Sequence, residues 1–430
     1  MKVSVEKIEK NKVAMEISIE AAKFTEGVEK ACRRLAARVS IPGFRRGKAP
    51  KPVVMRFLGK DYVYQEALDL ILPEVYYRAV EESGIEPIDR PEIEVKNMEE
   101  GQDLVVLAKV EVKPEVKLGQ YKGLEVKKEV KEVKDEDVQR ELEELRLKHA
   151  QLIPREEGEA VEKGDIVYID FEGSVDGKPF PEGGATDYPL ELGSGSFGPG
   201  FEEQLVGKKV GEEVEVRVTF PADYREEKLA GKEGVFKVKI KSAKKKELAE
   251  LDDEFAKDVS EFETLEELKT DLRNKLEKAA LDRAEQMVRD EIIEKVVAGS
   301  EVEVPQVMVE RRIDSMIESL ANHLRIMGYT LEDYLKQTGE DLNKIREEYR
   351  DRAYQLVKTD LVLEAIAKAE NIEATPEEVE KEIEKLAERY QQDKEQMRRL
   401  LEASGSLDML KESIIMKKTI NFLVENNVIA

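Results

Sequence analysis

The chain has 430 residues, of which 40% are hydrophobic and 39% charged, and its 71 basic and 95 acidic side chains leave a net charge of −24. This length favours two to four domains of about 100–200 residues each. No segment approaches the ~20 apolar residues that span a bilayer, and no apolar run follows Met1 and Lys2, so we expect a soluble cytoplasmic protein without a signal peptide. The single cysteine, Cys32, excludes an internal disulfide.

The inventory of reactive side chains also limits the chemistry. The only histidines are His149 and His323, which cannot form a metal site together with Cys32 alone. No Gly-x-Ser-x-Gly elbow accompanies them. We therefore expect that any activity works without a metal, a cofactor or a nucleophile.

Residues 1–112 show the pattern of a small α+β domain. Alternation and helical spacing of apolar residues predict strands over 3–5, 13–19, 92–95 and 104–112, and helices over 24–39 and 52–84. Gly59 and Pro73 are predicted to break the second helical stretch. Cys32 lies on the apolar face of the first helix and is interpreted as a core residue.

The segment from residue 30 to residue 60 is purely basic within an acidic chain. It contains no Asp or Glu, and its basic residues are Lys30, Arg33, Arg34, Arg38, Arg45, Arg46, Lys48, Lys51, Arg56 and Lys60. Pro42, Pro50 and two glycines frame a loop in its middle. This pattern indicates a surface that docks on a polyanion. The alternative is a solvated basic helix face followed by a mobile loop.

The loop sequence Gly43-Phe44-Arg45-Arg46-Gly47-Lys48-Ala49-Pro50 resembles the ribosome-docking signature Gly-Phe-Arg-x-Gly-Lys-x-Pro of the bacterial trigger factor family, with a match at every fixed position. The resemblance implies that residues 43–48 bind protein and RNA of the large ribosomal subunit beside the exit tunnel. Arg45, Arg46 and Lys48 would pair with anionic groups, in contacts that weaken with salt. Phe44 would add an apolar contact that salt does not screen.

Residues 113–157 are predicted to form a linker with a helix over 135–150. After it the sequence pattern changes to short alternating segments separated by glycine turns. Strands are predicted over 166–171, 188–192, 213–220 and 235–240, with a hairpin turn at Asp176-Gly177 and a short helix over 201–206. The region 158–246 therefore predicts a small antiparallel sheet wrapped on one helix. Gly193, Gly195 and Gly198 match the dinucleotide-binding pattern, but Gly207 stops the following helix too early for a βαβ unit, so we expect no nucleotide.

The middle region resembles the FKBP-type prolyl isomerase domain. The positions that match the FKBP pocket are Phe171, Phe180, Tyr188, Phe197, Phe201, Tyr224 and Phe236. The resemblance implies that the backbone N–H of Gly198 holds the substrate carbonyl. It departs from the family in two places, because Gly198 replaces the usual isoleucine and Pro181-Glu182 follows Phe180, which points to altered activity. Alternatively, these aromatic residues simply form the core of the domain, and the two interpretations are compatible.

Residues 247–430 are predicted to be helical almost throughout. Thr264 with Glu267 and Thr375 with Glu378 form capping boxes, and Gly299, Gly328 and Gly405 end helices. The helix that begins after Thr264 would be ~50 Å long. Such helices favour an elongated body with arms. Six methionines are candidates for adaptable client contacts, although core packing is the stronger explanation of methionines at helical spacing: Met308, Met316, Met327, Met397, Met409 and Met416.

The sequence thus predicts a multidomain α+β protein: a ribosome-binding domain (1–112), a linker that packs with the C-terminal body (113–157), an FKBP-type isomerase domain (158–246) and a helical chaperone domain (247–430). The resemblance implies that it binds nascent and unfolded polypeptides, without ATP or a membrane, and leaves room for a weak homodimer away from the ribosome. Two alternatives stay open: a free isomerase that does not dock on ribosomes, and an RNA-binding protein with an inactive isomerase fold.

Overall fold

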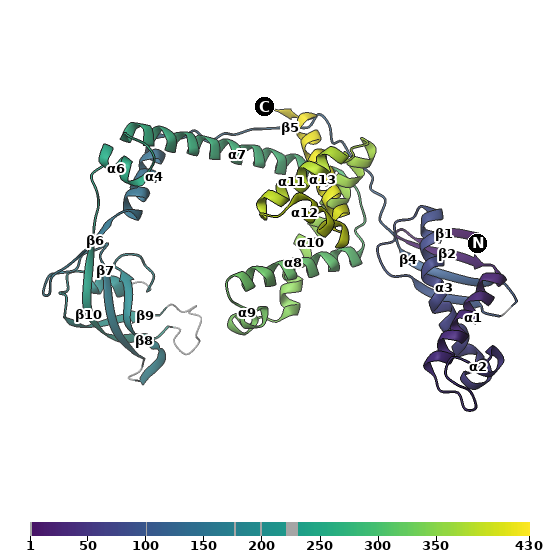
Figure 1. The fold of residues 1–430 in the computed structure, drawn as a ribbon. Coiled ribbons are helices and arrows are strands. Elements are labelled where there is room, and N and C mark those ends of the chain that lie inside the picture. Colours follow the sequence, from purple (N-terminus) through teal and green to yellow (C-terminus); the bar gives the residue numbers. More distant parts are fainter. Residues whose placement is uncertain (1, 100, 176–177, 198–199, 221–230) are drawn as a thin grey trace. The chain divides into compact units, whose positions relative to one another are not determined.

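The computed structural model describes residues 2–99, 101–175, 178–197, 200–220 and 231–430, with the backbone alone over 178–183. The predicted fold class is confirmed in that antiparallel sheets precede an all-helical C-terminal region (Figure 1). The chain forms two compact units. Unit 1 is Met1–Lys128 with Gln286–Ala430, and unit 2 is Glu129–Glu285.

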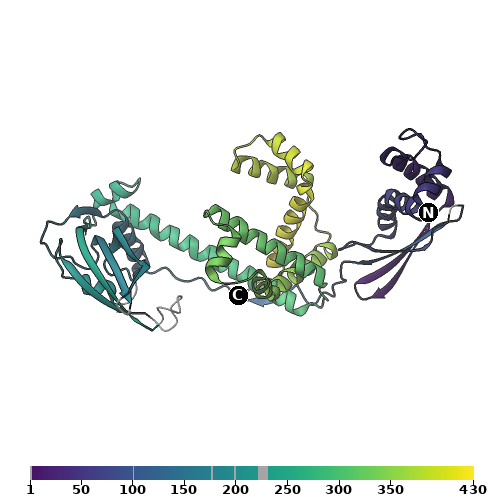
Figure 2. The same ribbon diagram turned by 90° about the horizontal axis from the view of Figure 1, so that it is seen from below.

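The N-terminal part of unit 1 is built on an antiparallel sheet of order β1-β2-β4-β3. Its strands are β1 (Lys2–Glu9), β2 (Lys12–Ile19), β3 (Glu92–Asn97) and β4 (Leu104–Glu111). Alternate residues of β4 are buried, so one face of the sheet belongs to the core. The helices of this part cover that face, as Figure 2 shows.

Three helices follow β2: α1 (Ala21–Arg38), α2 (Lys51–Leu58) and α3 (Lys60–Ser83). The predicted break at Gly59 is confirmed, but the predicted break at Pro73 is wrong, because α3 runs through it without interruption. A proline inside a helix costs about 3 kcal/mol. Burial opposes that cost, since α3 buries Val63, Leu68, Ile71 and Val75, and each large apolar side chain contributes about 1.5–3 kcal/mol.

Unit 2 contains a five-stranded antiparallel sheet in which β10 is central. One edge of β10 pairs with β7 and the other pairs with β9 and then with β6, while β8 pairs with β7. The strands are β6 (Gln151–Pro154), β7 (Ile166–Val175), β8 (Lys178–Glu191), β9 (Glu213–Thr219) and β10 (Glu233–Glu247). The turn predicted at Asp176-Gly177 lies outside the described residues.

The helix predicted over 201–206 is confirmed as α5 (Phe201–Leu205), and it packs on the inner face of this sheet. A second, smaller core of unit 2 joins α4 (Asp135–Lys148), α6 (Asp253–Val259) and the first part of α7 (Leu265–Gly299). The sequence predicted α4 and α7 but neither β6 nor α6, both of which are short.

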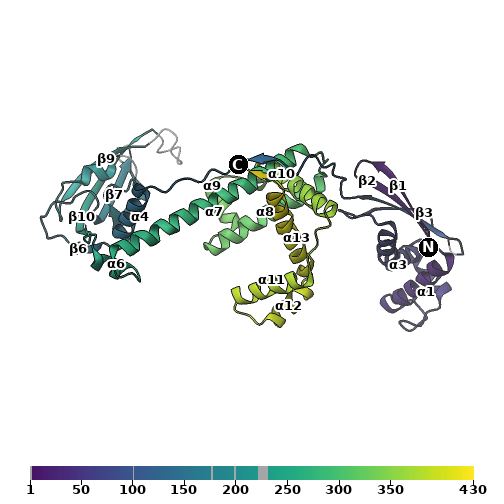
Figure 3. The ribbon, with the colours of Figure 1, turned by 90° about the horizontal axis from the view of Figure 1, so that it is seen from above.

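The C-terminal helices begin and end largely where their capping signals lie. Thr264 and Glu267 exchange backbone-to-side-chain hydrogen bonds of 3.2 and 3.3 Å, and Thr375 and Glu378 do the same at 2.8 and 3.3 Å. Figure 3 shows α11 and α12 lying together beside α13. After α7 follow α8 (Gln306–Ile326), α9 (Leu331–Thr338), α10 (Leu342–Ala369), α11 (Pro376–Arg389), α12 (Lys394–Ala403) and α13 (Ser406–Glu425).

The end of the chain pairs with a segment far from it in sequence. Strand β11 (Val428–Ile429) lies parallel to β5 (Glu125–Val126), and the Ala430 N–H donates to the Val126 carbonyl at 2.9 Å. The Lys128 N–H donates in turn to the Ala430 carbonyl, also at 2.9 Å. Across the described residues, no helix is both long and apolar enough to cross a lipid bilayer.

Candidate functional site

The Gly43–Lys48 loop, which joins α1 to α2, has a backbone fixed by short-range hydrogen bonds. The N–H groups of Phe44 and Lys48 donate to the carbonyls of Ile41 and Arg45 at 3.1 and 2.9 Å, and the Gly47 N–H reaches back to Ala36 in α1 at 2.8 Å. Gly43 and Gly47 have φ angles of +85° and +77°, which side-chain-bearing residues rarely adopt. The loop therefore has a defined shape, and its glycines are needed for that shape.

All six residues of this loop are exposed, including the aromatic one, since 42% of Phe44 is accessible. Within the described part of the chain, no acidic side chain pairs with Arg45, Arg46 or Lys48. An exposed phenylalanine beside three unpaired cations is typical of a binding surface, because nothing in its own fold uses these groups.

The helical half of the basic segment behaves differently. Lys30 pairs with Glu26 at 2.7 Å and Arg33 lies 3.9 Å from Glu29, both within α1. Arg34 and Arg38 approach Glu66 of α3, which is only 17% exposed, at 3.4 and 3.8 Å. The sequence treated the segment from residue 30 to residue 60 as one basic surface. The structure divides it: the four cations of α1 have acidic partners, whereas the three loop cations have none among the described residues.

In unit 2, five of the predicted aromatic residues form one cluster on the inner face of the sheet. Phe171 comes from β7, Tyr188 from β8, Phe197 and Phe201 from the turn and helix after β8, and Phe236 from β10. Ring centroids lie 4.8 Å apart for Phe171 and Phe197, 5.8 Å for Phe171 and Tyr188, and 5.4 Å for Phe201 and Phe236. Most of these pairs are edge-to-face, the arrangement that aromatic quadrupoles favour.

The cluster is graded from buried to accessible. Phe201 has no exposed area, Phe171 and Phe236 are almost fully buried, Phe197 is half-buried and Tyr188 is exposed. The Phe197 ring lies over the Phe201 ring, with 4.0 Å between centroids and 30° between planes. An apolar ligand would therefore contact Phe197 and Tyr188 first and reach Phe201 only after the Phe197 ring rotates.

The other predicted pocket residues are not placed. Gly198 and Tyr224 lie outside the described residues, and the side chain of Phe180 in β8 lies outside them as well. Phe220 packs against this core, with its ring centroid 6.4 Å from that of Phe236. The sequence analysis identified Phe220 only as the end of a strand. Its place at the end of an alternating strand was the available signal.

Sequence reasoning also missed a buried carboxylate beside the cluster. Glu202 of α5 is 4% exposed and accepts hydrogen bonds from the N–H groups of Gly193, Gly195 and Phe197. Burial of this carboxylate opposes its ionisation, but the backbone donors outweigh burial, so the pKa of Glu202 lies below its ordinary value. The turn Gly193–Phe197 is thereby tied to the helix that carries Phe201.

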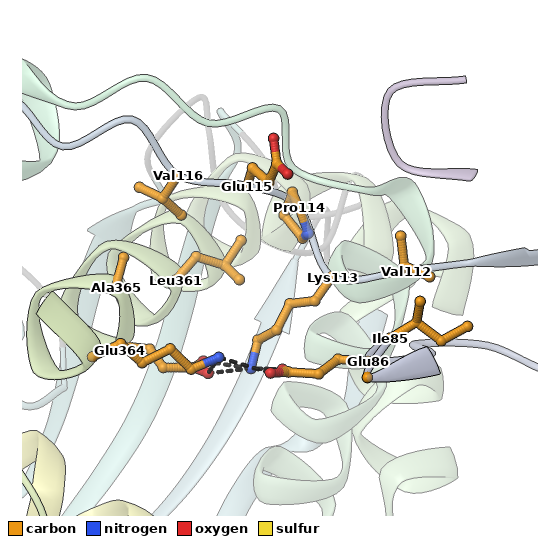
Figure 4. A pocket seen from close by; sticks show the side chains of 12 residues that line it. Ile85, Glu86, Val112, Lys113, Pro114, Glu115, Val116, Leu361, Glu364 and Ala365 are labelled. Carbon is orange, nitrogen blue, oxygen red and sulfur yellow. Dashed lines mark hydrogen bonds and ion pairs between the residues drawn. The ribbon is translucent and has the colours of Figure 1, made fainter. Parts of the chain in front are cut away.

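A cavity of about 340 Å³ in unit 1 has a different character (Figure 4). The Lys113 ammonium lies between the carboxylates of Glu364, at 2.6 Å, and Glu86, at 3.5 Å. Lys368 pairs with the same two glutamates. These four charges neutralise one another. Within the described part of the chain, no group of three or more His, Cys, Asp or Glu side chains is placed to hold a metal ion.

Comparisons with known proteins match nearly the whole chain. Residues 1–145 match the family model described as "Bacterial trigger factor protein (TF)", residues 264–425 match its C-terminus, and residues 157–241 match "FKBP-type peptidyl-prolyl cis-trans isomerase". The trigger factor of Pelotomaculum thermopropionicum is 51% identical over 426 residues, which cover 99% of this chain and 97% of the relative. The trigger factor of Geobacillus kaustophilus is 48% identical over 431 residues, covering both chains completely.

A solved structure agrees with these matches. It was reported for promiscuous substrate recognition in folding and assembly activities of the trigger factor chaperone. It is 28% identical to this chain, with a TM-score of 0.51 and 99% of each chain covered. The chain therefore belongs to the bacterial trigger factor family, and it carries an FKBP-type peptidyl-prolyl isomerase domain in its middle.

Proposed function

We propose that this chaperone docks on the large ribosomal subunit through the Gly43–Lys48 loop and holds nascent polypeptides as they leave the exit tunnel. The observation that carries the proposal is the exposed Phe44 beside three cations that lack acidic partners among the described residues. Ribosomal RNA and acidic protein groups supply the complementary charge. A rigid loop loses little conformational entropy on docking, which favours binding through so few residues.

The proposal also assigns a function to each domain of the chain. Residues 1–112 form the docking domain around their own core, and residues 158–246 form the isomerase domain around the aromatic core. Residues 113–157 link it to the body, and residues 247–430 form the part that holds clients in the cytoplasm. Release follows from weak affinity and mass action and needs no ATP.

Client binding is supported by large apolar side chains that the helices leave in solvent. Ile326 is 86% exposed at the end of α8, with Met327 and Tyr329 exposed beside it, and Met409 is exposed on α13. Met397, by contrast, is buried in the core of α11–α13, so the predicted methionine contacts separate into core and surface members. Flexible apolar side chains suit clients of varied sequence.

The aromatic cluster is the proposed site of isomerisation. Rotation about an X–Pro bond meets a barrier of about 18–20 kcal/mol, because amide resonance is lost in the twisted form. The planar amide is the more polar form, so an apolar surface of Phe171, Phe197 and Phe236 favours the twisted transition state without an acid or a base. Tyr188 lies at the exposed edge of that surface. Phe180, Gly198 and Tyr224 complete the proposed site.

Ribosome co-sedimentation tests the docking assignment. The combined variant Phe44→Ala, Arg45→Ala and Lys48→Ala is expected to lose most of its ribosome binding at physiological salt. The matched control is Lys30→Ala with Arg33→Ala, which removes cations that already have partners in α1. Unchanged pelleting of the triple variant would mean that docking takes place elsewhere, whereas a wild type that does not pellet with ribosomes would indicate a free isomerase.

Proline-limited refolding tests the isomerase site. The variants Phe201→Ala and Phe236→Ala are expected to lower the catalysed rate, whereas Phe44→Ala is expected to leave it unchanged because Phe44 lies in the docking loop. Equal rates for the wild type and both cluster variants would show that the activity of the domain does not use this cluster.

A further inference from the structure

The Glu202 carboxylate is satisfied almost entirely by one short turn. Oε2 accepts from the N–H of Gly193 at 2.7 Å and from that of Gly195 at 2.9 Å. Oε1 accepts from the N–H of Phe197 and from the Ser194 hydroxyl, each at 3.2 Å. Within the described residues no cation pairs with it, so the charge is balanced by converging backbone dipoles, as in anion-binding nests.

We propose that Glu202 is the positioning residue of the isomerase site, because its carboxylate fixes the turn Gly193–Phe197 in the place where Phe197 covers Phe201 and contacts Phe171. This inference rests on the proposed aromatic site. The hydrogen bond from Phe197 is made by its backbone N–H. The carboxylate therefore fixes the backbone of the turn and leaves the Phe197 ring free to rotate for an entering proline.

A separate anchor holds the helix that carries Glu202. The Gln204 side-chain amide donates to the carbonyls of Gly200 and Arg217 at 2.6 and 2.8 Å, and its oxygen accepts from the Arg217 N–H at 3.2 Å. Phe201 and Leu205 are also fully buried. Helix α5 thus remains fixed to β9 when the Glu202 carboxylate is altered, and only the turn on its other side is released.

The variant Glu202→Gln isolates the role of the carboxylate. It keeps the size of the side chain but places an NH₂ group against backbone donors, where the wild type has an acceptor. The turn then occupies its productive position for only a fraction of the time. Because the apparent dissociation constant rises as the competent fraction falls, the KM for a peptide with a single Leu-Pro bond should rise about tenfold with kcat little changed.

The experiment measures kcat and KM separately with the full chain and that peptide. Glu203→Gln is the matched control, since Glu203 is the next residue of α5 and is exposed, and it should behave as the wild type. A merely destabilising change would reduce the amount of active enzyme and hence kcat, not KM. The amide proton resonances of Gly193 and Gly195 should also move in Glu202→Gln and stay in place in Glu203→Gln.

The outcomes separate this inference from the proposed site. If Phe201→Leu retains full kcat/KM, the aromatic site is wrong and the role of Glu202 fails with it. If Phe201→Leu loses activity but Glu202→Gln has an unchanged or lowered KM, only the positioning role is overturned. Should Glu202→Gln unfold unit 2, Ser194→Ala removes one donor and keeps the carboxylate, and it should raise KM about twofold; an unchanged KM in that variant overturns the inference.

Discussion

Two glycine-containing turns of this chain differ in whether their polar groups face solvent or bind a buried carboxylate. In the Gly43–Lys48 loop the backbone is held by its own hydrogen bonds and the side chains face solvent without partners among the described residues. In the Gly193–Phe197 turn the backbone donors converge on the buried Glu202 carboxylate, and the aromatic side chain joins a core. The first arrangement leaves charge available for a partner, and the second uses charge to hold an apolar surface in place.

The same substitution in the two regions should give the largest contrast. Phe201→Ala removes a fully buried ring and is expected to destabilise unit 2 by about 3–5 kcal/mol. Phe44→Ala removes an exposed ring and should change stability by less than about 0.5 kcal/mol. Hydrogen exchange of the full chain, followed by mass spectrometry of peptides from each region, measures both. Comparable protection losses in the two variants would remove the distinction.

Charge reversal sharpens the docking half of the comparison. Arg45→Glu with Lys48→Glu places acidic groups on the surface that is proposed to bind a polyanion, and it should weaken ribosome binding by about a hundredfold or more. Lys30→Glu with Arg33→Glu reverses the same amount of charge in α1, where the cations have partners, and should have a much smaller effect. If both double variants lose binding equally, overall charge and not the loop determines docking.

Added salt should change the ribosome affinity but not the isomerase activity, with a smaller effect than charge reversal. Ribosome affinity is expected to fall steadily with added salt, and Arg45→Ala should reduce the slope of log affinity against log salt by about 1. The kcat/KM of the isomerase for a neutral peptide should stay within about twofold over the same range, because its surface is apolar. A salt-independent ribosome affinity would contradict an electrostatic docking loop.

The smallest expected effect concerns a polar contact that belongs to neither turn. Arg346 and Arg350 of α10 donate to Glu310 of α8, and these hydrogen bonds lower the pKa of Glu310 to about 2. A lowered folded-state pKa stabilises the fold above the unfolded-state value and loses that contribution as pH falls towards 2. The wild type should therefore be slightly more stable than Glu310→Gln at pH 7.

That difference should shrink between about pH 4.5 and pH 2, the interval from the ordinary glutamate pKa to the folded-state value. Urea unfolding at several pH values measures it. Glu318→Gln on the same helix is the control, since Glu318 is exposed. An equal pH dependence for both variants would mean that the Glu310 contacts add nothing to stability.

Local signals in the sequence predicted the elements well where a single interaction decides the outcome. Capping boxes at Thr264 and Thr375 and the glycine at 59 mark real helix ends. Pro73 misled because its local cost is outweighed by burial along α3, and burial depends on partners that are distant in sequence. Strand β6 and helix α6 are too short to show a period in the sequence.

The candidate site could be predicted only in part for a related reason. The resemblance to FKBP-type domains brought together Phe171, Tyr188, Phe197, Phe201 and Phe236, because aromatic residues stand out in a sequence. Glu202 did not stand out, since one of two adjacent glutamates reads as an ordinary surface charge. Its burial follows from a turn that folds back over the start of α5, and no local pattern encodes that return.

The short parallel pairing of β5 with β11 has a consequence for how the protein folds during its synthesis. Ile429 lies beside Val126, so one element of unit 1 is completed only when residues more than 300 positions apart meet. During synthesis, residues 125 and 126 therefore stay unpaired until residues 428 and 429 have been translated. The β5–β11 pairing is therefore one of the last parts of unit 1 to form as the chain is synthesised.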